Sequence, residues 1–338
     1  MNLTNFLVHL RFERYFPTKI SKNIYLTNRM QRVHFIAIGG ETVQNLAIAM
    51  SKKGSFLVTG SDSEISEPTR IRLKECRVLP DELGWFPDKI YKGLQAVVLG
   101  ENVTPDNPEL VRAKELGLKI YSYPEFIFQQ TRSKTRIVVS GSHGKRITAA
   151  MILFVLKQLK MDADYMVSAP LEGSSNLVKL SYESRIAVFE GDEFPISAID
   201  NRPKFHLYKP HIAVITGITT DYVPVFKDFE NYVLQFQKFA DLMEVQGRLI
   251  YFDGDEQLNK IAESLRRDIV PFPYNTPDHE VKNGLTYLKT KYGEVALNIS
   301  GDHNLQNMDA ARLACRQIGV SDEQFYSIIS GFEDEPGL

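Results

Sequence analysis

The apolar residues of this chain form short continuous runs that alternate with longer segments of helical periodicity. The runs cover residues 33–38, 56–59, 96–99, 118–121, 137–139, 185–189 and 212–216. Continuous apolar runs of this length are typical of strands buried on both faces. The segments between them, such as residues 42–53 and 146–160, show the periodicity of amphipathic helices. Strands separated by helices predict an α/β fold with parallel sheets.

The length of the chain and one polar stretch predict two domains. A chain of 338 residues exceeds what one hydrophobic core usually organises. Residues 129–134 lack apolar periodicity and are interpreted as a linker. We therefore predict an N-terminal appendage (1–29), a first domain (30–131) and a second domain (135–332). In the second domain, a strand over 294–299 and helices over 305–318 and 322–330 follow the runs described above.

Composition excludes several classes of protein. The formal net charge of -2 and the 43% hydrophobic content are typical of a globular protein without a basic excess for nucleic acid. No apolar run approaches the roughly 20 residues of a membrane-spanning helix. The two cysteines, Cys76 and Cys315, lie far apart, which indicates neither a disulfide framework nor a zinc site. We expect a cytoplasmic protein.

A glycine-rich turn follows the strand at 137–139. Its sequence is Ser140-Gly141-Ser142-His143-Gly144-Lys145, and a predicted helix begins directly after it. A strand, a glycine turn and a helix N-terminus aim backbone N–H groups at one point, and a lysine there favours the phosphates of a nucleotide. The spacing Gly-x-x-Gly-Lys is shorter than the full P-loop consensus. Two interpretations remain, a phosphate site or an ordinary connection with a surface lysine.

Arg146, the residue after the lysine, is unusual for a P-loop. A serine or threonine at this position provides a hydroxyl ligand for Mg²⁺. A guanidinium cannot bind a metal, but it binds phosphate oxygens bidentately and is always charged. The sequence therefore predicts a loop that holds phosphate without catalysing its transfer.

Polar residues follow other predicted strands of the second domain. Glu190, Asp192 and Glu193 come after the strand at 185–189, at the sheet edge that also carries the glycine loop. Carboxylates beside phosphates predict a bound Mg²⁺, and the alternative is a solvated acidic loop. Asn304 and Asn307 have amides that can read an adenine edge, and the alternative is that His303 and Asn304 only cap the following helix.

The first domain contains a second glycine turn. The strand at 33–38 ends in Gly39-Gly40, and Asp62 follows Gly60-Ser61 about 20 residues later, where nucleotide-binding folds hold a ribose. The complete Gly-x-Gly-x-x-Gly fingerprint is missing, and the carboxylate of Glu41 would repel a pyrophosphate. This turn either binds a substrate or binds nothing.

Seven stretches together resemble the Mur ligase family of ATP-dependent peptidoglycan ligases. They are residues 34–40, 60–62, 106–109, 141–145, 190–193, 202–208 and 301–304. The resemblance implies a Rossmann-like UDP-binding domain followed by a P-loop-like α/β ATPase domain with a parallel sheet. It implies that a carboxylate of UDP-N-acetylmuramate attacks ATP. The resulting acyl phosphate reacts with the amine of L-alanine or of a murein peptide, in peptidoglycan synthesis or recycling.

The resemblance also implies roles for single residues. The UDP of the substrate would contact Gly39, Gly40, Ser61 and Asp62. ATP would contact Gly141, Ser142, His143, Gly144, Lys145, Arg146, His303, Asn304 and Asn307. Lys145 and Glu190 would be catalytic, and Glu190 would bind Mg²⁺.

Three departures from the family pattern predict weak activity or none. Arg146 replaces the threonine after the lysine, and Tyr222 replaces the histidine after Asp221. The family's C-terminal domain is predicted to be missing after residue 332, so a separate chain that supplies it is an expected partner. Two hypotheses follow: a working ligase, or a truncated homologue that binds a nucleotide or UDP-sugar without catalysis.

Overall fold

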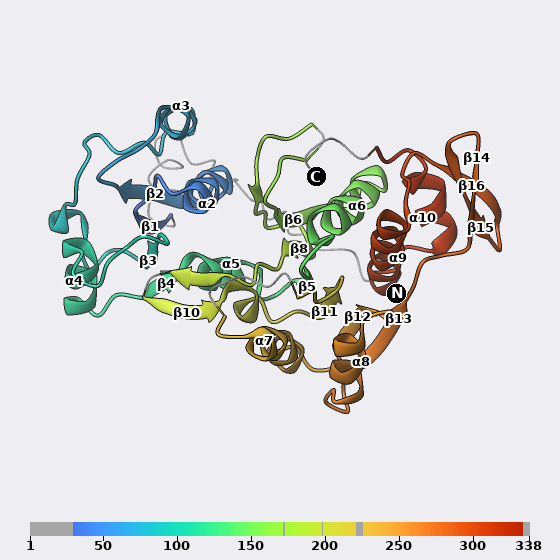
Figure 1. Ribbon diagram of the computed structural model, residues 1–338. Coiled ribbons are helices and arrows are strands. Elements are labelled where there is room, and N and C mark those ends of the chain that lie inside the picture. The colour runs from blue at the N-terminus through green and yellow to red at the C-terminus, as the bar shows by residue number, and fades with distance from the viewer. Residues whose placement is uncertain (1–29, 172, 198, 221–225, 334–338) are drawn as a thin grey trace, which may run out of the picture.

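The computed structural model describes residues 30–171, 173–197, 199–220 and 226–333 of the chain. They form two parallel sheets flanked by helices and one small antiparallel sheet, which lie in a row in Figure 1. The predicted α/β class with parallel sheets is confirmed. The N-terminal appendage (1–29) and the pair Asp221-Tyr222 lie outside the described residues.

The first sheet has four parallel strands in the order β2-β1-β3-β4. The strands are β1 (Gln31–Ile36), β2 (Phe56–Ser61), β3 (Ala96–Leu99) and β4 (Ile120–Ser122). The helices are α2 (Glu41–Lys52), α3 (Glu67–Glu75), α4 (Pro108–Glu115) and α5 (Tyr123–Thr131), with a 3₁₀ turn at Pro87–Lys89. Since β1 lies in the middle of the sheet, its C-terminal end and the turn before α2 lie between β2 and β3.

The second sheet has seven strands in the order β13-β12-β11-β5-β8-β6-β7, and only the edge strand β7 is antiparallel to its neighbour. The strands are β5 (Thr135–Ser140), β6 (Ala163–Met166), β7 (Val178–Lys179), β8 (Ile186–Glu190), β11 (Ile212–Ile215), β12 (Arg248–Phe252) and β13 (Val270–Tyr274). The helices are α6 (Lys145–Gln158), α7 (Phe229–Asp241), α8 (Glu256–Glu263), α9 (Asp302–Gln317) and α10 (Asp322–Ile329). The central strand β5 leads directly into the glycine loop.

Both faces of the second sheet are buried. Ile137 and Val139 of β5 pack toward α6, α9 and α10, whereas Val138 packs into the core that contains α7 and α8. Figure 1 shows these two helix groups on opposite sides of the sheet. Burial on both faces explains why the strand sequences are continuously apolar.

The structure corrects several details of the sequence prediction. The segment interpreted as a linker begins inside α5, which continues to Thr131, and both Thr131 and Lys134 are buried. The strand expected at 294–299 is β16 (Gly293–Leu297), which pairs in the antiparallel sheet with β15 (Leu285–Thr290). That sheet also contains β14 (His279–Lys282), and a separate antiparallel pair joins β9 (Pro195–Ser197) and β10 (Asp200–Pro203). The strands β9, β10, β14 and β15 were not predicted, because short exposed strands lack a continuous apolar run.

The two parallel sheets share a packed boundary. One apolar cluster extends from Phe35 and Phe126 beside the first sheet to Phe189 and Phe205 beside the second. Lys52 of α2 donates to Asn176 Oδ1 across the boundary (3.0 Å). Within the described ranges, the structure contains no helix with the length and apolarity to cross a bilayer.

Candidate functional site

The glycine loop is tightly packed between β5 and α6. Gly141 and Gly144 have φ angles of +131° and +79°, which side-chain-bearing residues rarely adopt. A Cβ atom on Gly144 would lie 2.2 Å from Asn307 Oδ1, and one on Gly141 would lie 2.3 Å from Thr216 Oγ1. Because Gly144 is the N-cap of α6, no side chain of that residue caps the first-turn N–H groups. The loop thus presents backbone donors at a helix N-terminus.

Asn307 lies against this loop from α9. Its side chain is 2% exposed, and its Nδ2 atom has no hydrogen-bond partner among the residues that the structure describes. A buried amide without a partner indicates a place where a ligand or water completes the hydrogen bonding. The expected capping by His303 and Asn304 is wrong, because α9 begins at Asp302 with Gly301 as N-cap. His303 is exposed in the first turn, and Asn304 donates to Ser300 O (3.1 Å).

Lys145 forms an ion pair at the start of α6. Its Nζ atom lies 2.8 Å from Glu193 Oε2, and Glu193 is nearly buried. The Ser142 hydroxyl accepts from Thr219 N–H (3.0 Å) and lies 3.1 Å from Tyr232 Oη. The charge of Lys145 is thus balanced by Glu193 at the start of α6.

Arg146 and Glu190 are connected through Ser168. Arg146 Nε donates to Ser168 Oγ (3.0 Å), and that hydroxyl donates to Glu190 Oε2 (2.5 Å). Ser168 N–H donates to Glu190 Oε1 (3.0 Å). Burial raises the pKa of Glu190 above its usual range, although the Ser168 hydrogen bonds and the charges of Arg146 and Lys145 oppose the shift. Both oxygens of this carboxylate are already hydrogen-bonded within the protein.

The turn after β1 in the first sheet is held by its own carboxylate. Asp62 Oδ2 accepts from Gly39 N–H (2.7 Å), and Asp62 Oδ1 accepts from Glu64 N–H (3.3 Å). Burial raises the pKa of Asp62 despite these hydrogen bonds. Ser61 is fully buried, with its Oγ 3.4 Å from His34 Nε2. Of the four predicted UDP contacts, Gly40 is the most exposed.

A buried lysine connects the two sheet edges. Lys204 Nζ lies 3.0 Å from Glu101 Oε1 in the first half and 3.1 Å from Asp192 Oδ2 in the second. Burial alone would lower the pKa of Lys204, but the two carboxylates raise it. Burial and the same carboxylates raise the pKa of the neighbouring Tyr123 well above its usual value. This cluster joins the segment after β3 to the segment after β8.

The structure brings together only part of the predicted set. Gly141 to Arg146, Glu190 and Asn307 lie around the start of α6, whereas the residues predicted for UDP lie at the edge of the other sheet. Sequence reasoning missed three residues. Thr216 packs against the loop, Ser168 donates to the Glu190 carboxylate, and Lys204 pairs with carboxylates on both sides of the boundary. Lys204 could have been noticed in the motif at 202–208, but Ser168 and Thr216 carry no signal of their own.

Comparison with known proteins identifies the family. Residues 139–315 match the Mur ligase middle domain, and residues 32–135 match the Mur ligase family catalytic domain. The chain belongs to the Mur ligase family. The sequence resemblance is thereby confirmed.

Mur ligase relatives of known sequence are longer than this chain. UDP-N-acetylmuramate–L-alanine ligase from Carboxydothermus hydrogenoformans is 28% identical over 319 residues, covering 91% of this chain and 66% of the relative. The enzyme of the same name from a Sulfurihydrogenibium species is 28% identical over 301 residues, covering 86% and 63%. The chain thus spans slightly less than two thirds of the length of these relatives.

A solved Mur ligase structure has the same fold. It is UDP-N-acetylmuramate:L-alanyl-γ-D-glutamyl-meso-diaminopimelate ligase from Neisseria meningitidis. The TM-score is 0.76 at 21% identity, and the match covers 91% of this chain and 99% of that one.

The residues around the loop fit a nucleotide better than a magnesium ion. The unpaired Asn307 amide and the glycine cradle fit a polyphosphate and its base. The expected metal carboxylate, Glu190, is occupied by Ser168, and a guanidinium stands where a hydroxyl ligand is needed. With a guanidinium in the position of the hydroxyl ligand, these side chains do not fit Mg²⁺.

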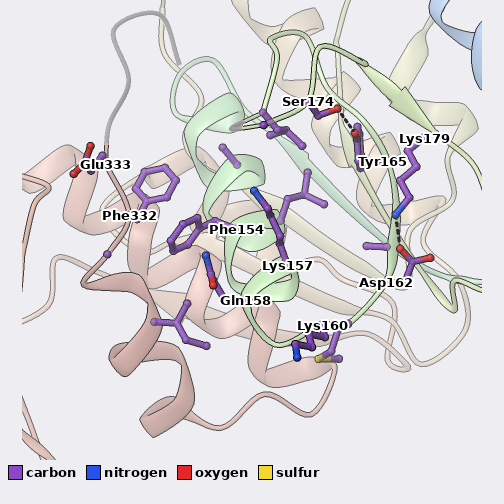
Figure 2. Close-up of a pocket in the computed structure, with 18 of the residues that line it drawn as sticks. Phe154, Lys157, Gln158, Lys160, Asp162, Tyr165, Ser174, Lys179, Phe332 and Glu333 are labelled. Atoms are coloured by element: carbon purple, nitrogen blue, oxygen red, sulfur yellow. Dashed lines mark hydrogen bonds and ion pairs between the residues drawn. The ribbon is translucent and has the colours of Figure 1, made fainter.

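A cavity lies away from the loop, at the other end of α6 (Figure 2). It measures about 1000 Å³ and is bordered by Lys157 and by Phe154, which stacks edge-to-face on Phe332. Tyr165 Oη lies 3.1 Å from Ser174 Oγ on its wall. Its lining includes residues of the C-terminal half of α6 and of α10, so the cavity is separate from the N-terminus of α6.

Proposed function

We propose that this chain binds ATP at the glycine loop and a UDP-N-acetylmuramate-type substrate at the first sheet, and that it acts as an ATP-dependent ligase. Family membership supports this proposal. So do the names of the relatives, which are ligases of UDP-N-acetylmuramate and L-alanine. The observation that carries the nucleotide part is the buried, unpaired amide of Asn307 against Gly144.

The proposed reaction forms an amide at the expense of ATP. The substrate carboxylate attacks the γ-phosphorus of ATP and ADP leaves. The amine of L-alanine or of a murein peptide then attacks the acyl phosphate, which releases inorganic phosphate and a proton. The ion-pair cluster of Lys204, Glu101 and Asp192 supports this arrangement, because it joins the edges of the two sheets.

Within this proposal each element of the loop has a role. The first-turn N–H groups of α6 and Lys145 hold the triphosphate, with Glu190 nearby. Asn304 is partly exposed one turn before Asn307, so we assign Asn304 to the adenine and Asn307 to the loop beside it. In the other half, Gly39 and Gly40 border the diphosphate of the UDP-sugar.

Binding and turnover test separate parts of the proposal. Calorimetric titration of the purified chain with ATP, and separately with UDP-N-acetylmuramate, should give saturable binding for each. Phosphate release should then require ATP, the UDP-sugar and an amine together. A chain that binds neither ligand would refute the proposal, and one that binds both without releasing phosphate would limit it to binding.

A further inference from the structure

Arg146 occupies the position at which P-loop sites provide a hydroxyl for Mg²⁺. It is the second residue of α6 and directly follows Lys145. A guanidinium has five N–H donors and no acceptor, so it cannot act as a metal ligand. It also carries a fixed positive charge at all accessible pH values, which would oppose a divalent cation beside it.

The surroundings fix this charge next to the loop. Ser168 Oγ accepts from Arg146 Nε and donates to Glu190 Oε2. Glu190 is 7% exposed and receives a second hydrogen bond from Ser168 N–H. A metal ion that used Glu190 would bind a carboxylate that already accepts two hydrogen bonds from Ser168, and it would lie close to the guanidinium. Arg146, Ser168 and Glu190 are thus linked by hydrogen bonds beside the loop.

We propose that the glycine loop of this chain binds the polyphosphate of a nucleotide without Mg²⁺, with Arg146 providing the positive charge that the metal provides in other P-loop sites. This proposal rests on the proposed nucleotide site and adds how its charge is balanced. The ligand class is a nucleoside di- or triphosphate in its metal-free form. A guanidinium suits it because it contacts two phosphate oxygens at once.

The two carboxylates near the loop, Glu190 and Glu193, are compatible with a bound polyphosphate. Glu193 is paired with Lys145, and Glu190 is hydrogen-bonded on both oxygens. The first-turn N–H groups of α6 add the partial positive charge of a helix N-terminus.

Titration with ATP in Mg²⁺ and in EDTA, at matched ionic strength, tests the proposal. We expect dissociation constants that agree within about threefold, a difference of roughly 0.7 kcal/mol. Binding that is at least about tenfold tighter with Mg²⁺ would overturn the inference and leave the proposed function intact. A complete lack of ATP binding in both solutions would overturn both.

Two variants sharpen the test. Arg146→Thr should lose about tenfold or more in affinity in EDTA, since a charged hydrogen bond is removed, and should recover affinity when Mg²⁺ is added. Arg70→Thr makes the same change at an exposed position of α3 and should behave as the parent chain. An Arg146→Thr protein that binds ATP in EDTA as well as the parent would refute the assignment.

Glu190→Gln provides a measurement that does not depend on the arginine. Without a metal, removal of its negative charge should leave ATP affinity in EDTA unchanged or make it tighter. A loss of affinity that appears only with Mg²⁺ would identify Glu190 as a metal ligand and overturn the proposal. Thermal melts of the ligand-free variants establish that each protein is folded.

Discussion

The two glycine turns of this molecule share a strand-to-helix geometry but differ in charge. In the second sheet, the helix after the turn begins with Lys145 and Arg146, and an unpaired amide of Asn307 lies beside it. In the first sheet, the helix begins with Glu41, and the N–H of Gly39 is already bound by Asp62. The comparison shows that backbone geometry alone does not make a phosphate site, because the surrounding charges decide what can enter.

The first turn also binds a carboxylate of its own, that of Asp62. Asp62 receives two backbone hydrogen bonds, yet burial keeps its pKa raised. The hydrogen bonds of the turn therefore do not offset the cost of burying this carboxylate.

The largest effect should come from a methyl group in the second turn. Gly144→Ala places a Cβ 2.2 Å from Asn307 Oδ1 at a φ of +79°, so the loop must move. We expect about a 100-fold loss of ATP affinity and a stability cost of about 1–3 kcal/mol. Calorimetry and thermal melts measure the two effects.

The matched substitution lies in the first turn. Gly40 has a φ of -58°, and its nearest neighbour would be 3.6 Å from the new methyl, so Gly40→Ala should change stability by less than about 0.5 kcal/mol. Equal losses of ATP affinity in the two variants would show that the second turn has no special role.

Removal of the lysine charge should have the next largest effect. Lys145→Met removes a charged donor, and we expect a loss of about 10- to 100-fold in ATP affinity. It also leaves the nearly buried Glu193 without its cation, so stability should fall. Calorimetric titration gives the affinity, and denaturant unfolding gives the stability.

The double variant Lys145→Met/Glu193→Gln separates the two consequences. Stability should return toward the parent value because the buried charge is gone, but ATP affinity should stay low. Recovery of ATP binding in the double variant would mean that Lys145 acts only by neutralising Glu193.

Much of this fold could be predicted from the sequence. The central strands β1, β3, β5, β8 and β11 are mostly buried, so their apolar runs stand out, and the glycine loop follows one of them directly. The strands β6, β7, β12 and β13 of the second sheet were not predicted. The strands β14 and β15 were not predicted, because exposed antiparallel strands alternate polar and apolar residues and resemble loops, whereas β16 was expected at 294–299. The start of α9 was misplaced by three residues, since Asp302, His303 and Asn304 look like capping residues although Gly301 is the cap.

The site was less predictable than the fold. Lys145 and Glu190 follow strand ends, where the order of the chain indicates a ligand edge. The link from Arg146 through Ser168 to Glu190 joins three elements, and no spacing in the sequence reveals it. The same holds for Lys204, whose carboxylate partners Glu101 and Asp192 belong to different halves. Contacts of this kind depend on tertiary packing.

A smaller effect is expected from the acidic residue of the first turn. Glu41 is the first residue of α2, where a negative charge opposes a diphosphate that approaches the turn. Glu41→Gln should raise the affinity for UDP-N-acetylmuramate about two- to fivefold, and added salt should reduce the gain. Titration at two ionic strengths measures both quantities. An affinity that falls instead would place Glu41 among the groups that contact the substrate.

The smallest effect concerns the pH dependence of stability in the first turn. The folded pKa of Asp62 is raised above its unfolded value of 3.8, so between the two values the folded state binds more protons than the unfolded state. Stability therefore falls as pH rises through this window, and Asp62→Asn should lack the decline. Thermal melts between about pH 3.5 and 7 measure the difference between the two proteins.

The direction of this pH dependence shows whether the first turn, like the glycine loop, favours a bound negative charge. Asp81→Asn, at an exposed position of the same half, is the matched control and should follow the parent curve. If the parent chain instead gains stability over the variant as pH rises, the N–H groups at Gly39 and Glu64 must stabilise the charged carboxylate more than burial opposes it. The first turn would then be an anion site like the glycine loop, occupied by its own Asp62, and a diphosphate would have to displace that side chain to bind.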